Sequence, residues 1–288
     1  MAILKVDTIS GIGTEGPVFD GDIEFTSQNF LTLPKGDTTQ RGRGRVFIGA
    51  GSDGSLLPRI DYIEIQSQGN AIDFGDLTAA TSLTASFASS TRGVIAGGAN
   101  PDSINTIEFI TIATTSNATE FGDLTDEKRY HAGLSNQTRG LTAGGAGYPS
   151  PARTNIIDFV TIASEGNAQD FGDLSKTRKY ISCLSNSVRA VAAGGGGGDS
   201  STQNTMMEFV TIATTGDAVD FGDCSDTNGT NGSGNCSSSI RGIFAGFYPS
   251  PYTIEYITFP TGGNSVDFGD LNYHGYYNGT CSNGHGGL

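Results

Sequence analysis

One set of five aspartates and one set of five arginines recur at nearly even spacing in this 288-residue chain. Carboxylates are the ligands that hard cations prefer, so a ring of aspartates would be a candidate cation site. The competing interpretation is structural: a turn cap, or a hydrogen bond between neighbouring repeats that is made five times. We favour the structural role. The two sets are Asp76, Asp123, Asp173, Asp223 and Asp270, and Arg45, Arg92, Arg139, Arg189 and Arg241.

Catalytic chemistry has little support in the sequence. The triplet Asp73-Phe74-Gly75 matches the magnesium-binding triplet of kinases, but it recurs without a phosphate-binding loop or catalytic-loop signature beside it. The glycines at 194–198 lack the Lys-Ser/Thr of a P-loop. The histidines, His131, His274 and His285, do not recur with the repeat. We therefore predict that the protein is not an enzyme, and we assign no catalytic, cofactor-binding or metal-ligating residue.

Charge and hydropathy argue against two further classes of function. A formal net charge of −14 disfavours binding of nucleic acid, which requires clustered Lys and Arg. No stretch approaches the roughly 20 apolar residues of a membrane helix, and residues 1–7 do not read as a secretory signal. The four cysteines lack CxxC spacing, which predicts reduced thiols that pack as small apolar groups. A disulfide or metal site is the alternative for them.

The recurring residues are positioned by a repeat whose clearest mark is a phenylalanine followed by Gly-Asp. Its five copies are Phe74, Phe121, Phe171, Phe221 and Phe268, so the spacing is 47 to 50 residues. A recurrence of about 40–50 residues indicates propeller blades or solenoid units. Each unit divides into four β segments: a small polar one, one that runs from arginine to glycines, one that alternates acid and aromatic residues, and the Phe-Gly-Asp segment. Four short strands per unit are typical of a propeller blade.

The two ends of the repeat region indicate a closed ring. No first segment precedes Arg45, whereas residues 277–283 read as a first segment with nothing after it. We therefore predict an all-β, five-bladed β-propeller of four-stranded blades over residues 42–288, closed by the C-terminal strand. The small first strands should line the axis, and the phenylalanines should pack between blades. Residues 1–41 should form a short extended arm that docks on another surface or oligomerises.

The repeat resembles the kelch repeat. The residues that carry the resemblance are the small polar start at 131–136, Gly144-Gly145 at the end of the second segment, and the aromatic Phe159 in the third. Kelch units have a tryptophan that is absent from this chain, and the phenylalanine of Phe-Gly-Asp stands in its place. The resemblance implies a propeller fold and carries little information about function.

The arm resembles the start of tail-fibre and other virion proteins of tailed bacteriophages. Residues 4–9, residues 18–21 and the Leu-Pro-x-Gly-x-Thr-x-Gln-Arg stretch at 33–41 carry this resemblance. The Asp-Phe-Gly-Asp-Leu propeller is similar to structural proteins of phages that infect marine cyanobacteria. The resemblances imply a virion component that is assembled in the cytoplasm of a bacterial host. They imply other virion proteins as partners of the arm, and a homo-oligomer, with a trimer as one form.

The links between segments indicate a binding face. Links between the second and third segments, and between the fourth and first, vary most in length, and in an antiparallel blade both emerge on one face. We call it the variable face. Exposed tyrosines there would suit sugar rings or another protein. The candidates are Tyr130, Tyr148, Tyr248 and Tyr252.

Three functions remain open at the level of sequence. The first is a non-enzymatic virion structural protein, located in the tail fibre, the tail or the capsid, which displays the propeller as a head. The second is a receptor-recognition module that binds a host surface glycan. The third is a cytoplasmic kelch-like scaffold for protein interactions, which fits the propeller but not the arm.

Overall fold

The structure is a computed structural model, and it describes residues 44–52, 54–64, 68–147, 153–197, 205–225, 234–246 and 252–273. All of them belong to the second of the two units into which the chain divides, Asp37–Leu288. The predicted arm, residues 1–41, and the predicted closing strand, residues 277–283, lie outside the described residues. Tyr148 and Tyr248 do so as well.

The described residues form five antiparallel blades, as predicted. Blades 2 to 5 each have four strands, and three strands of blade 1 are described. The strands are β1 (Arg45–Ser52), β2 (Leu56–Glu64) and β3 (Ile72–Asp76) in blade 1; β4 (Ala85–Ala88), β5 (Arg92–Ala99), β6 (Ser103–Thr111) and β7 (Thr119–Asp123) in blade 2; β8 (Ala132–Ser135), β9 (Arg139–Ala143), β10 (Ile156–Thr161) and β11 (Gln169–Asp173) in blade 3; β13 (Ser182–Ser185), β14 (Arg189–Ala193), β16 (Met206–Thr211) and β17 (Val219–Asp223) in blade 4; and β18 (Gly234–Ser237), β19 (Arg241–Ala245), β20 (Thr253–Thr258) and β21 (Val266–Asp270) in blade 5.

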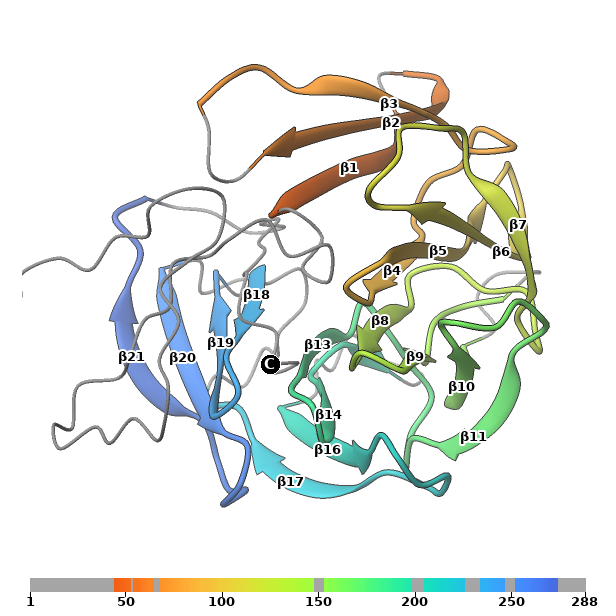
Figure 1. The fold of residues 1–288 in the computed structure, drawn as a ribbon. Helices are drawn as coiled ribbons and strands as arrows, with labels where there is room; N and C mark the ends of the chain where they lie inside the picture. Colours follow the sequence, from red (N-terminus) through yellow and green to blue (C-terminus); the bar gives the residue numbers. More distant parts are fainter. Residues whose placement is uncertain are drawn as a thin grey trace, which may run out of the picture. The chain divides into compact units, whose positions relative to one another are not determined.

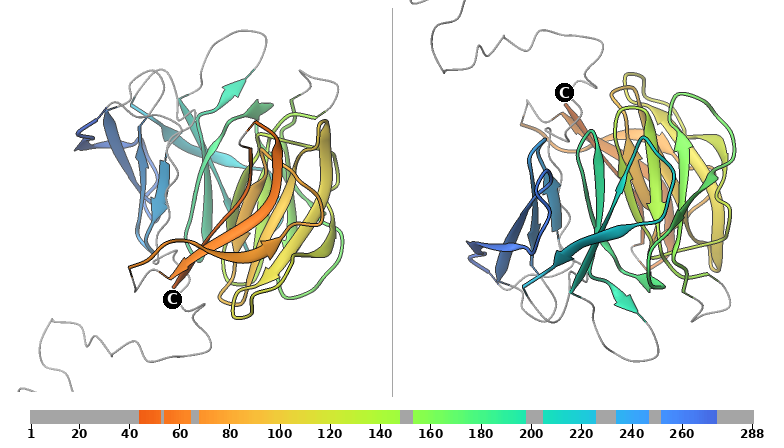
Figure 2. Two further views of the ribbon diagram at one scale, coloured as in Figure 1. Left: turned by 90° about the horizontal axis from the view of Figure 1, so that it is seen from above. Right: turned by 90° about the horizontal axis from the view of Figure 1, so that it is seen from below.

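The blades are arranged around a central axis, with the first strand innermost in blades 2 to 5 and the fourth strand outermost in all five blades (Figure 1). In the side views of Figure 2 the strands run from one face of the ring to the other, so that the links lie at the two faces. Two short strands, β12 (Arg178–Lys179) and β15 (Gly196–Gly197), pair in the links of blade 4. No helix occurs among the described residues, and hence none of these residues forms one that could span a membrane.

Crowding near the axis explains the small residues of the first strands. A Cβ on Gly133 of β8 would lie 2.5 Å from the backbone oxygen of Ser86 in β4. Serine hydroxyls link the same strands, since Ser135 donates to Ala88 O at 2.8 Å and Ser185 donates to Ser135 O at 2.9 Å. Larger side chains would push these strands apart.

The glycine of each Phe-Gly-Asp segment is required by its backbone. In blade 3, Gly172 of β11 lies opposite Ile157 at a β-bulge, with a φ of 143° that residues with a Cβ rarely adopt. An added Cβ would also lie 2.5 Å from the backbone of Gly216, in blade 4. The glycine therefore lets two neighbouring blades approach closely. The same bulge recurs in all five blades.

The hydrophobic core lies between blades rather than within them. Four clusters of buried side chains each join one blade to the next, from the pair of blades 1 and 2 to the pair of blades 4 and 5. We call each such junction a seam. In the seam of blades 3 and 4, Phe171 packs with Val210 and Ile212 of the next blade.

Candidate functional site

Four of the five recurring arginines bond across a seam, and among the described residues Arg241 is the exception. Arg139 in blade 3 donates a hydrogen bond of 3.0 Å to the carbonyl oxygen of Ile212 in blade 4, and its guanidinium lies 4.8 Å from the ring centroid of Phe159. Each of the other four stacks on the aromatic residue of its own third strand in the same way. Arg45, Arg92 and Arg189 also bond to a carbonyl of the next blade, at Ile112, Ile162 and Phe259. These arginines tie neighbouring blades together.

The recurring phenylalanines fill the same seams, with one exception. Phe74, Phe121, Phe171 and Phe221 are all buried. Phe268 in blade 5 is 53% exposed, so the prediction that it packs between blades is wrong for the described residues. The reason is that no described residue of blade 1 covers it, whereas its four counterparts each lie against the following blade.

The sequence predicted either a turn cap or a hydrogen bond between blades for the recurring aspartates, and those with described partners bond between blades, mainly through their main chains. Asp173 N–H donates to Oδ1 of Asp217 at 3.0 Å, and Asp173 O accepts from Ala218 N at 2.8 Å, both across the seam of blades 3 and 4. Among the described residues, only the Asp223 carboxylate of this set accepts a side-chain hydrogen bond, from Thr205. Each aspartate ends the outermost strand of its blade, so the five belong to five different blades. Within the described part of the chain, no group of three or more His, Cys, Asp or Glu side chains is arranged to hold a metal ion.

A second set of acids, in the third strands, is buried at the seams. Glu108, Asp158, Glu208 and Glu255 are all buried, and each accepts a hydrogen bond from the Thr or Ser that follows the Phe-Gly-Asp-Leu/Cys segment of the preceding blade. The recurring Thr or Ser after each Phe-Gly-Asp-Leu/Cys segment is the sequence feature that could have predicted this contact. The alternation of acid and aromatic residues did not reveal that the acids are buried, because alternation also suits a strand with one solvent-exposed face.

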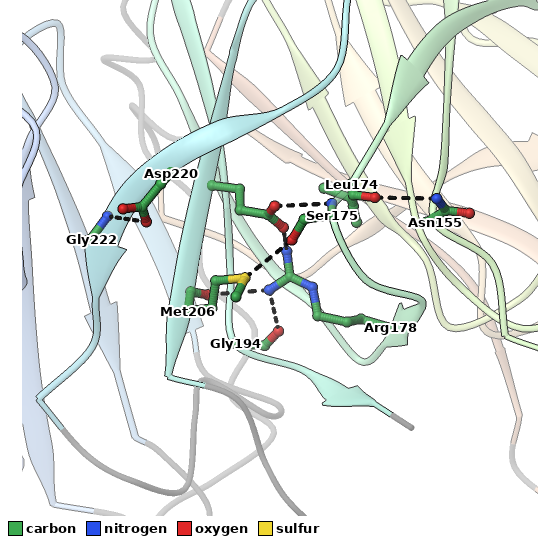
Figure 3. A network of polar contacts seen from close by, with 9 residues as sticks. Asn155, Leu174, Ser175, Arg178, Gly194, Met206, Asp220 and Gly222 are labelled. Carbon is green, nitrogen blue, oxygen red and sulfur yellow. Dashed lines mark hydrogen bonds and ion pairs between the residues drawn. The ribbon is translucent and has the colours of Figure 1, made fainter. Parts of the chain in front are cut away.

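Two of these acids also form buried ion pairs. Lys128 Nζ lies 2.6 Å from Asp158 Oδ2, with side-chain exposures of 0% and 1%. Burial lowers the pKa of Lys128, and the facing Asp158 carboxylate opposes that shift. Arg178 pairs with Glu208 in the same way and donates to the carbonyl oxygens of Gly194 at 2.9 Å and Met206 at 3.2 Å (Figure 3). Each pair joins a fourth-to-first link to the third strand of the blade that follows the link.

His131 is buried beside the first of these pairs. Its Nε2 lies 3.0 Å from the carbonyl oxygen of Ala96 in blade 2. Burial lowers the pKa of His131 to about 3, and the nearby Lys128 adds to the shift. The imidazole is therefore neutral at neutral pH and holds blade 3 to blade 2.

The two variable links share one face, as predicted from strand order. Arg129, in the link that enters blade 3, forms a β-bridge with Ala146, and Ala146 also bridges to Arg153. Lys179, in the link that enters blade 4, pairs with Gly196 in β15. Main-chain hydrogen bonds therefore hold the backbone of the described parts of these links.

Of the predicted tyrosines, two lie in the described part of this face. Tyr130 contacts Tyr180, with ring centroids 4.5 Å apart and ring planes at 53°. Tyr252 lies in the link between the second and third strands of blade 5 and is 48% exposed. The prediction missed Tyr180, Lys179 and Arg153. A comparison of Lys128-Arg129-Tyr130 with Arg178-Lys179-Tyr180 would have found two of them, since both triplets occupy the same position of the repeat.

The fold and these seams define a β-propeller protein with five blades. The solved structure of YjhT is similar to this chain, with a TM-score of 0.67 and 12% sequence identity, over 83% of this chain and 84% of that chain. At this level of identity the similarity concerns the fold alone. No family model matches the sequence, and no curated protein matches it.

Proposed function

We propose that this chain is a non-enzymatic structural protein of a phage particle, in which residues 1–41 dock onto other virion proteins or trimerise and the kelch-like propeller is displayed as a stable head. The observation that carries the proposal is the use of the recurring residues. Four of the arginines, the buried phenylalanines and the Thr/Ser–acid contacts all hold one blade to the next. A particle component needs such stability, because it must persist outside the cell without turnover.

The resemblance of the arm supplies the location. The stretch at 33–41 is similar to the start of tail-fibre and other virion proteins, so the arm is the natural attachment segment. The charge of −14 favours solubility of a displayed head.

The test is deletion of residues 1–41, followed by assembly of particles in infected cells. We expect the truncated protein to be absent from purified particles while its thermal unfolding remains cooperative. A full-length protein with Lys176→Gln, an exposed change far from the arm in sequence, serves as the control for expression. If particles incorporate the truncated protein at the normal level, the arm is not the attachment segment and the proposal fails.

A glycan-binding function is the second candidate, favoured by Tyr130 and Tyr180 on the variable face. Paired tyrosines offer apolar surface with hydroxyl groups at its edge, a combination that suits sugar rings. Adsorption of the purified protein to host cells tests this candidate separately from particle assembly. Absence of adsorption would leave the structural role alone.

A further inference from the structure

The strongest cluster of unexplained side chains lies around the Tyr130–Tyr180 pair. Lys179 Nζ lies 5.4 Å from the ring centroid of Tyr130 and 5.0 Å from that of Tyr180. The guanidinium of Arg129 lies 5.5 Å from the Tyr130 centroid. Arg153 bridges to the link of Arg129 through Ala146, and its charge acts on Lys179, so the group holds three cations and two rings.

Ion pairing with acids does not explain why Arg129 and Lys179 lie close together. The chain has 16 Lys and Arg against 30 Asp and Glu, yet three cations gather in one place. Within the described residues, neither Arg129 nor Lys179 forms an ion pair with an acid, and the Arg129 Nε is buried with no hydrogen-bond partner. Burial lowers the pKa of Lys179, and the charges of Arg153 and Arg129 lower it further. This repulsion is a cost that an anionic ligand would remove.

The preceding blade shows that the fold does not need these residues. In the link that enters blade 2, the positions of Arg129 and Tyr130 are taken by Ser82 and Leu83. Leu83 has a φ of 59°, and Tyr130 and Tyr180 both have a φ of 58°, so this left-handed conformation belongs to the fold. The cations and the rings are additions at the two following links.

The backbone holds the two tyrosines in fixed positions. Tyr180 N–H donates to Tyr130 O at 2.9 Å, and Tyr130 N–H donates to Leu83 O at 3.3 Å. The rings are partly exposed and tilted with respect to each other. A site whose side chains are ordered before binding loses less entropy when a ligand arrives.

We infer that Arg129, Tyr130, Arg153, Lys179 and Tyr180 form a binding site for an acidic saccharide. The rings would pack against the apolar face of a sugar, and the cations would bind its carboxylate or sulfate group. This inference deepens the glycan-binding candidate and rests on it, since it specifies the location of the site and the charge of the ligand. It is independent of the attachment role of the arm.

The experiment measures binding of full-length protein to three tetrasaccharides by calorimetry: glucuronate, sulfated galactose and neutral glucose. We expect binding of at least one acidic probe, and weaker binding when NaCl is raised from about 50 to about 300 mM, because salt screens the cations. Lys179→Gln should weaken that binding by about tenfold, the loss of one charged hydrogen bond. The matched control is Lys176→Gln, which removes the same charge from an exposed position three residues away and should leave the affinity unchanged.

The contribution of the rings is tested with Tyr130→Asn, because asparagine tolerates the left-handed backbone and should leave the fold intact. Its control is Tyr273→Asn, which removes a 57% exposed tyrosine after the last strand of blade 5. We expect only Tyr130→Asn to weaken binding. Equal effects of Lys179→Gln and Lys176→Gln, or no binding of either acidic probe, would overturn the inference. Tight binding of the neutral probe that is insensitive to Lys179→Gln would overturn it but leave a glycan-binding function.

Discussion

Phe171 and Phe268 occupy the same position of the repeat, but Phe171 is 2% exposed and Phe268 is 53% exposed. The difference extends to their neighbours. A Cβ on Gly172 would meet the backbone of blade 4 at 2.5 Å, whereas one on Gly269 would meet nothing within 4 Å. Arg139 bonds to the next blade, and among the described residues Arg241 only stacks on Tyr256 of its own blade.

The comparison teaches that the Phe-Gly-Asp segment is half of a contact. The other half is the third strand of the following blade, together with the loop after it. Where that following blade is described, the segment is buried. At the edge of blade 5 the same residues face no described partner. Three of the following four predictions test this contrast, and one tests the seam of blades 2 and 3.

The largest expected effect is on the phenylalanines. Phe171→Ala should lower the free energy of unfolding by about 3–5 kcal/mol, because it removes a buried ring and leaves a cavity between blades 3 and 4. Phe268→Ala should change it by less than about 1 kcal/mol, as is usual for an exposed side chain. Urea unfolding of both variants measures the difference. Equal losses would mean that Phe268 is covered in solution.

The glycines should show a smaller contrast. Gly172→Ala and Gly269→Ala both force a Cβ onto a backbone with φ near 140°, which costs about 1–3 kcal/mol. Only Gly172→Ala also clashes with the neighbouring blade, which should add about 1–3 kcal/mol. Thermal unfolding of the pair isolates the clash. A larger loss of stability in Gly269→Ala than in Gly172→Ala would contradict the contrast between blades 3 and 5.

His131 should make one seam sensitive to pH. Its pKa is 6.5 in the unfolded chain and about 3 in the folded one, so between these values the unfolded state binds more protons. Stability from this residue is therefore complete above pH 6.5 and falls by about 1.4 kcal/mol for each pH unit below it. In His131→Ile, which copies Ile181 of the next repeat, we expect a shallower loss of stability between pH 6.5 and 4.5. An unchanged slope would show that His131 titrates normally in the folded protein.

The arginines should show the smallest contrast. Arg139→Met keeps apolar contact with Phe159 but loses the hydrogen bond to Ile212 O, at a cost of about 1 kcal/mol. Arg241→Met should cost less, because its guanidinium is tied to no described carbonyl. Unfolding midpoints of the two variants test the order, and a reversed order would count against the seam role of these arginines.

The repeat was sufficient to predict the number of blades, the axis-lining first strands and the burial of four phenylalanines, because each follows from spacing and residue size. The buried pair of Lys128 and Asp158 was beyond such reasoning. An acid in an alternating strand is normally exposed, and spacing alone does not show that Thr125 and Lys128 both come to Asp158. The sequence did not predict the group of Arg129, Arg153 and Lys179 for a related reason, since these residues come from three different links.

The seams have a consequence for how such a chain can change its length. Each blade carries the donor half of a contact on its fourth strand and the acceptor half on its third strand. A tandem duplication of one repeat, about 50 residues, would therefore bring a matching half for both of its neighbours. Circular permutation that opens the chain at a link between blades would likewise keep the donor and acceptor groups of every seam. The contact at the seam, rather than the blade alone, is therefore what a duplication of the repeat preserves.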